Sequence, residues 1–152
     1  HIFVFDLLAL GDCEAMGSAL AGLLADASIT KLGFACSGDL ASLRKLPGFG
    51  ACRESVPASL VDLQRLAADR RAAERGTSPK RELQGLGLAS LTLQVLGRPL
   101  DKAMQMSNWA RRPLRPAQLE YAALDAWVLL ALHKRLTRTW PHGLGWLLRP
   151  LA

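Results

Sequence analysis

A carboxylate stands inside an otherwise apolar stretch, EYAALDAWVLLAL, which covers residues 120–132. Between residues 122 and 132 every residue except Asp125 is Ala, Leu, Trp or Val, and this pattern predicts a helix packed on more than one side. A carboxylate that is desolvated without a partner costs on the order of several kcal/mol. We therefore expect Asp125 to be ion-paired, protonated or bound to a metal ion.

Tyr121 precedes Asp125 by about one helical turn. At about 100° per residue, Gln118, Tyr121 and Asp125 lie on one helical face, so the phenol and the carboxylate address the same small volume. The pair is compatible with hydrolytic or metal-dependent chemistry. The alternative from these residues alone is a core tyrosine beside an aspartate that is ion-paired with one of the 19 Lys and Arg residues.

The elements that position this helix are predicted from hydrophobic periodicity and from the turn residues. We expect strands over His1–Leu8 and Ile29–Cys36 and near Ser55–Leu63, with helices over Cys13–Ala25 and from Asp39 to a point before Pro47. The part of the last strand from Ser59 onward also fits a helix. Strands that alternate with helices in this way favour a βαβ arrangement with a largely parallel sheet.

The second half of the chain is predicted to be helical. Residues 70–82 are charged and contain Gly and Pro, which predicts a loop or mobile linker. A helix in GLASLTLQVLG should stop at Gly97, and Pro116 suits the first position of the long helix that contains Asp125. Residues 139–152 are broken by Gly and Pro, and we expect them to form a tail.

Length and composition limit the classes of protein to which this chain can belong. A chain of 152 residues with 50% hydrophobic content suits one domain with a real core, and its net charge of +6 permits a polyanionic partner. Cys13, Cys36 and Cys52 have neither disulfide-framework nor zinc-site spacing, which favours a reducing intracellular location, either nucleus or cytoplasm. No apolar run approaches the roughly 20 residues of a membrane span, so no membrane partner is expected.

A longer pattern surrounds the Tyr121–Asp125 pair. A leucine-rich helix with LG is followed by W-x-x-R-P-L, from Trp109 to Leu114, and then by Q-x-x-Y-A-A-x-D. This order resembles the third motif of the DEDDy 3′-to-5′ exonucleases, the group of RNase D, the Werner-syndrome exonuclease domain and the Nibbler-type enzymes. The match is best over residues 83–136 and weaker back to His1.

The resemblance implies an α/β, RNase H-like exonuclease fold with a mixed sheet flanked by helices. It matches Asp125 to the last metal-binding carboxylate and Tyr121 to the tyrosine that positions the attacking water. Asp39 matches the second motif, although its residue type equally suits a helix N-cap. The implied cofactors are two divalent cations, Mg²⁺ or Mn²⁺, which prefer carboxylate oxygens, and the implied substrate is the 3′ end of single-stranded RNA or DNA.

The chain departs from the family pattern at the first motif, a D-x-E in the opening strand. The letters recur at Asp12 and Glu14, but these residues follow Gly11 at an expected helix start, and Asp6 is followed by leucines. Two of the four expected carboxylates are therefore absent. We expect residues 1–138 to be a partial exonuclease domain that lacks N-terminal strands, and to have negligible activity alone.

Basic and aromatic residues near the third motif are candidate nucleic-acid contacts. Arg111, Arg112 and Arg115 suit bidentate contacts to phosphates, and they equally suit a solvated basic loop. Trp109 either stacks on a base or anchors its loop to the core. The basic residues between 70 and 81 would add nonspecific affinity.

Three functions remain open from the sequence. The first is a metal-dependent 3′-to-5′ exonuclease that hydrolyses the 3′ end of a single strand, with RNA favoured over DNA. The second is a noncatalytic module on the same fold that binds nucleic acid or protein. The third is an unrelated α/β domain in which the tyrosine and the aspartate are paired by chance.

Overall fold

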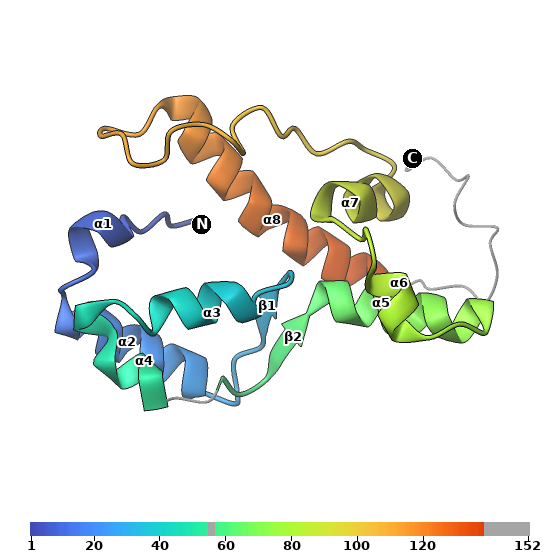
Figure 1. The fold of residues 1–152 in the computed structure, drawn as a ribbon, viewed down its shortest axis with the longest axis horizontal. Coiled ribbons are helices and arrows are strands. Elements are labelled where there is room, and N and C mark those ends of the chain that lie inside the picture. The colour runs from blue at the N-terminus through green and yellow to red at the C-terminus, as the bar shows by residue number, and fades with distance from the viewer. Residues whose placement is uncertain (55–56, 139–152) are drawn as a thin grey trace. The chain divides into compact units, whose positions relative to one another are not determined.

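The computed structural model describes residues 1–54 and 57–138 (Figure 1). The tail expected over residues 139–152 lies outside the described residues. The chain divides into two compact units, one from Phe3 to Asp62 and the other from Leu63 onward together with His1–Ile2. Among the described residues no helix combines the length and hydropathy that a membrane crossing requires.

The first unit contains short helices around a small sheet. In chain order its elements are α1 (Leu7–Leu10), α2 (Glu14–Ala25), β1 (Lys31–Gly33), α3 (Ser37–Leu43), η1 (Pro47–Phe49), α4 (Gly50–Glu54) and β2 (Leu60–Asp62). Strands β1 and β2 pair in parallel, with Lys31 opposite Leu60 and Gly33 opposite Asp62. The predicted parallel crossover is therefore confirmed, with both strands shorter than expected.

The core of this unit forms where α2, η1 and α4 meet. Phe49 and Cys52 are buried together with Ala21, and Met16, Leu20, Leu43 and Leu46 pack against them. The approach of α2 to η1 is close, because a Cβ added at Gly17 would lie 2.1 Å from the Gly48 carbonyl oxygen. The Cys52 thiol donates to the Gly17 carbonyl oxygen over 3.4 Å and joins α4 to α2.

The strand predicted for His1–Leu8 is wrong. Residues 1–6 have no regular structure, and α1 begins at Leu7. Asp6 caps this helix, because its side chain accepts a hydrogen bond from the backbone N–H of Leu8 over 3.1 Å. The sheet in the described residues consists of β1 and β2, so the β-branched and aromatic residues before Asp6 have no strand to pair with.

The second unit consists of helices. These are α5 (Leu63–Arg75), α6 (Pro79–Leu83), α7 (Leu88–Leu96) and α8 (Pro116–Arg138). Helix α8 contacts both α5 and α7. The buried side chains include Ala67, Ala68 and Ala72 of α5, Leu91 and Val95 of α7, and Val128, Leu132 and Leu136 of α8.

Two predicted helix boundaries in this unit are confirmed, and one feature is wrong. Helix α7 ends before Gly97, whose φ of 69° is the left-handed conformation that favours glycine, and α8 begins at Pro116. Helix α8 was expected to be apolar and packed on more than one side. Trp127 is 52% exposed and Leu130 is 62% exposed, so one apolar face of α8 remains exposed.

The linker predicted over residues 70–82 is also wrong. Helix α5 continues to Arg75 and α6 begins at Pro79, which leaves only three residues between them. Gly76 has a φ of 63°, and Ser78 caps α6 by accepting a hydrogen bond from the backbone N–H of Arg81. The charged residues here belong to a tight turn between two helices, which the Arg75–Glu82 ion pair holds together.

Candidate active site

Tyr121 and Asp125 meet on α8 as predicted. Asp125 is half-buried, and its Oδ1 atom is buried without a hydrogen bond from any described residue. Burial raises the pKa of Asp125, while a hydrogen bond from Tyr121 and the charge of Lys102 partly oppose that rise. Burial also raises the pKa of Tyr121, and the neighbouring Asp125 carboxylate raises it further. The phenol is therefore protonated at neutral pH and donates a hydrogen bond to Asp125, whose Oδ1 atom has no hydrogen-bond partner.

Trp109 supports this pair from the loop between α7 and α8. Its ring centroid lies 5.9 Å from that of Tyr121, with the two ring planes at 52°. The indole N–H donates to the carbonyl oxygen of Met104 over 3.1 Å and lies 3.3 Å from that of Gln105. These contacts favour the anchoring role of Trp109, and stacking on a base stays a prediction.

Gln118 has a structural role that its position on the helical face did not predict. Its side chain is buried, and its Oε1 accepts from the backbone N–H of Arg115 over 3.0 Å. Its Nε2 donates to Ser107 Oγ over 2.9 Å and to the Asn108 carbonyl oxygen over 3.1 Å. One amide therefore fastens the middle of the loop, next to Trp109, and its C-terminal end to the first turn of α8.

Replacing Gln118 with Ala should lower the free energy of unfolding by about 2–3 kcal/mol, because three partly buried hydrogen bonds are lost and the Arg115 N–H and the Asn108 carbonyl lose their side-chain partner. The measurement is urea denaturation. Gln105→Ala, at an exposed position in the same loop, is the matched control and should change the value by less than about 0.5 kcal/mol. Equal effects of the two substitutions would show that the Gln118 contacts do not hold the loop.

The three arginines of this loop differ in their contacts. All three are exposed, but Arg112 Nη1 donates to the carbonyl oxygen of Trp109 over 2.8 Å and to that of Arg111 over 2.9 Å. Arg112 therefore stabilises the turn of its own loop. Arg111 and Arg115 are the better candidates for phosphate contacts, because their exposed guanidiniums leave forked donor sets open to a ligand.

Asp39 lies in the first turn of α3 and is exposed. The prediction that Asp39 is the N-cap is wrong, because α3 begins at Ser37 and its N-cap is Cys36. The difference arises in the turn after β1, which places Ser37 and Gly38 inside the helix. A shared metal site requires Asp39 and Asp125 to approach each other. They belong to different compact units, so this approach stays a prediction.

Asp62 is a residue near Asp39 that the sequence reasoning missed. It ends β2, and its Oδ1 accepts from the backbone N–H of Ala35 over 3.1 Å, while the Cys36 thiol lies 3.9 Å from its Oδ2. Ala35 has a φ of 52°, a conformation that is strained for a residue with a Cβ. Asp62 therefore holds the turn from which α3 starts. The signal that could have identified Asp62 from the sequence is its position at the end of one strand of a parallel pair.

The described residues supply one candidate metal ligand. The buried Asp125 Oδ1 lacks a hydrogen bond, and a carboxylate oxygen of this kind fits a hard divalent cation. Among the described residues, however, no group of three or more His, Cys, Asp or Glu side chains is placed to hold an ion. Glu14 is exposed at the first position of α2, as expected for a helix start. The donor set around Asp125 is thus incomplete.

Comparisons with known proteins also assign this chain to an exonuclease family. A family model described as 3′-5′ exonuclease matches residues 1–140. The human exonuclease mut-7 homolog is 40% identical over 148 residues, which are 91% of this chain and 17% of that protein. The chain therefore spans less than a fifth of this relative.

Solved structures agree with the sequence matches. The Nibbler EXO domain of Aedes aegypti has a TM-score of 0.66 at 33% identity, covering 81% of this chain and 58% of that one. RNase D of Trypanosoma brucei, solved in complex with RNA U12, has a TM-score of 0.68 at 28% identity, covering 92% of this chain and 45% of that one. The expected RNase H-like exonuclease fold is confirmed by these neighbours.

Proposed function

Because this chain belongs to the 3′-5′ exonuclease family, we propose that it contributes Tyr121, Asp125 and Asp39 to a site that hydrolyses the 3′-terminal phosphodiester bond of single-stranded RNA. The observation that carries the proposal is the Tyr121–Asp125 pair, in which the buried Oδ1 atom of Asp125 has no hydrogen-bond partner. RNA is favoured over DNA because the similar RNase D of Trypanosoma brucei is solved with RNA.

Each residue has a defined role in this proposal. Asp125 and Asp39 hold two divalent cations, Mg²⁺ or Mn²⁺, which would polarise the phosphate and activate water. Tyr121 remains protonated at neutral pH, because burial and the Asp125 carboxylate raise its pKa. Its hydroxyl therefore donates a hydrogen bond and positions the attacking oxygen. Arg111 and Arg115 contact phosphates of the bound strand, and Trp109 holds Tyr121 in place.

The test is the stepwise shortening of a single-stranded RNA labelled at its 5′ end, in the presence of Mn²⁺. The 152 residues alone are compared with a longer chain that carries them and also supplies a D-x-E strand. We expect activity only in the longer chain, since Asp39 and Asp125 leave the donor set incomplete. Asp125→Asn should reduce this activity at least about a hundredfold, because it replaces a metal ligand.

The matched control is Glu120→Gln, which removes an exposed carboxylate from the same helix and should leave the rate unchanged. Inactivity of the longer chain, with binding of the strand retained, would favour the noncatalytic binding module. Activity that survives Asp125→Asn would refute the assignment of this carboxylate.

A further inference from the structure

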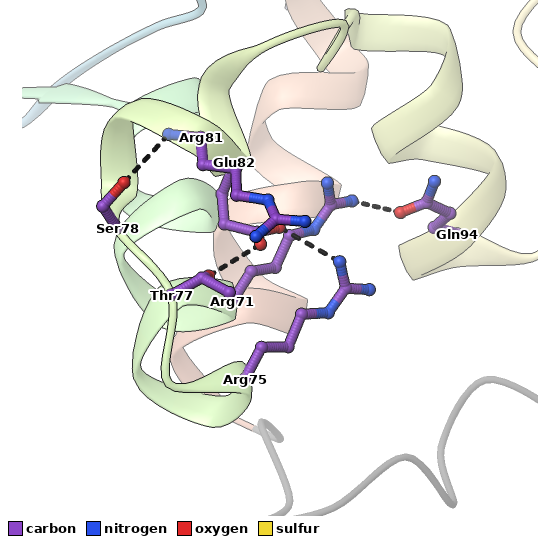
Figure 2. Close-up of polar contacts among 7 residues, drawn as sticks. All are labelled: Arg71, Arg75, Thr77, Ser78, Arg81, Glu82 and Gln94. Carbon is purple, nitrogen blue, oxygen red and sulfur yellow. Dashed lines mark hydrogen bonds and ion pairs between the residues drawn. The ribbon is translucent and has the colours of Figure 1, made fainter.

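A second group of charged residues lies where α5 turns into α6. Glu82 is buried, with a side chain 8% exposed, and accepts hydrogen bonds from Thr77 Oγ1 over 2.8 Å and from Arg75 Nη1 over 3.1 Å (Figure 2). Both oxygens of the carboxylate therefore have partners. Glu82 fastens α6 to the end of α5, which explains why this charged segment is folded.

Arg71 lies one helical turn before Arg75 on α5, so the two guanidiniums share a face. Arg71 donates a hydrogen bond to the Gln94 side chain of α7 (Figure 2). Burial lowers the pKa of Arg71, and the positive charge of Arg75 lowers it further, while Glu82 and Glu74 oppose this. The fold therefore holds two positively charged guanidiniums close together in a partly desolvated environment. Such a pair favours the binding of an anion beside it.

Helix α6 adds further positive charge. Lys80 and Arg81 are both exposed in this short helix, next to the buried Glu82 in sequence. Arg75 keeps 53% of its side chain exposed despite its ion pair. We define the α5–α6 corner as Arg71, Arg75, Lys80 and Arg81. Its four cations outnumber the two carboxylates that act on Arg71, those of Glu82 and Glu74, and each guanidinium has five N–H donors.

The α5–α6 corner is separate from the loop at the candidate active site. Helices α5 and α6 lie beside the C-terminal end of α8, whereas residues 98–115 lead to the N-terminal end of α8 (Figure 1). Tyr121 and Asp125 lie in the N-terminal half of that helix. A ligand at the corner would therefore be a part of the substrate away from the reacting bond.

We propose that the α5–α6 corner is a second contact site for backbone phosphates of single-stranded nucleic acid, distant from the strand end at Tyr121 and Asp125. The inference rests on the proposed function, because it extends the footprint of the same substrate. Forked guanidinium donors suit phosphate oxygens, and such contacts position the strand without reading its sequence. The corner should therefore raise affinity for long strands and leave the chemistry at the strand end unchanged.

The experiment measures binding of a fluorescent single-stranded RNA by the 152-residue chain in EDTA, where hydrolysis is suppressed, over a range of salt concentrations. Lys80→Gln with Arg81→Gln removes two exposed charges, so it spares the Glu82 contacts. The slope of log Kd against log salt should fall by about 0.7 for each lost contact, or about 1.4 in total. Arg71→Gln, tested separately, should lower the slope by about 0.7. It should also lower the Tm, because the hydrogen bond from Arg71 to Gln94 of α7 is lost.

The control pair is Arg65→Gln with Lys134→Gln, which removes two exposed charges from α5 and α8 outside the corner. Equal slopes for the corner and control variants would overturn the inference. Competition by polyglutamate as effective as that by RNA would assign the corner to an acidic protein and would also overturn it. Because binding is measured without hydrolysis, a longer chain that fails to cleave RNA would refute the proposed function without deciding this result.

Discussion

Asp125→Asn should stabilise the fold at neutral pH by about 1 kcal/mol, while it removes hydrolysis. The Asp125 Oδ1 atom is buried without a hydrogen bond, so the ionised carboxylate destabilises the folded state. Asn has the same shape and no charge. Residues that serve chemistry often reduce stability in this way. The measurement is the free energy of unfolding from urea denaturation, compared with Glu120→Gln, which should leave it nearly unchanged.

The pH dependence of this difference has a defined sign. The pKa of Asp125 is raised in the folded state above its ordinary value of 3.8, chiefly by burial. Below 3.8 the carboxyl is protonated in both states and Asp and Asn should be nearly equal in stability. As pH rises through the folded pKa, the wild-type protein loses stability relative to Asp125→Asn. An advantage of Asn that grew toward acid pH would contradict the assignment.

The same substitution should also change the titration of Tyr121. This residue is the only tyrosine in the chain, so ultraviolet absorbance of tyrosinate reports Tyr121 alone. The Asp125 carboxylate raises the pKa of Tyr121 through its charge and its hydrogen bond, and Asp101 adds a smaller effect. Asp125→Asn should lower the pKa of Tyr121, and Asp101→Asn should lower it less. The reverse order would show that Tyr121 does not face Asp125.

Divalent cations should stabilise the fold by binding the Asp125 carboxylate. An ion that binds the folded state through Asp125 stabilises it by mass action, so Mn²⁺ should raise the Tm of the longer chain that completes the donor set. Removal of the ion with EDTA should reverse the rise, and Asp125→Asn should abolish it. A rise in Tm that persists in Asp125→Asn would place the ion elsewhere.

Gly17→Ala should destabilise the first unit by about 2 kcal/mol or more. The added Cβ would lie 2.1 Å from the Gly48 carbonyl oxygen and 2.8 Å from the Phe49 Cα, and both contacts are with backbone. Helix α2 would have to move away from η1 and disturb the core around Phe49. Overpacking of this kind costs about 1–3 kcal/mol or more, which exceeds the helix propensity gained.

Gly22→Ala is the matched control, since the same change in the same helix meets no atom within 4 Å. It should stabilise the protein by up to about 1 kcal/mol, because alanine restricts the unfolded chain and favours the helix. Denaturant unfolding of both variants measures the contrast. Similar effects at the two positions would show that α2 and η1 do not approach each other as closely as described.

Local sequence determined the boundaries of several helices. Gly97 ends α7, Pro116 begins α8, and α2 begins within one residue of its predicted start. These boundaries were predictable because proline, glycine and capping preferences act over a few residues. The parallel pairing of β1 and β2 followed from the alternation of strands and helices. The Tyr121–Asp125 pair also followed from local spacing, because one helical turn brings the two side chains together.

The tertiary structure decided what depends on distant partners. The residues before Asp6 have strand-like composition but no partner strand in the described sheet. The charged segment after α5 is folded because buried Glu82 binds Arg75 and Thr77. Gln118 holds the loop that carries Trp109, and Asp62 holds the turn before α3, through contacts with residues from other segments. Such pairings depend on which chain segments meet in space, because a buried polar group must find its partner wherever the fold supplies one.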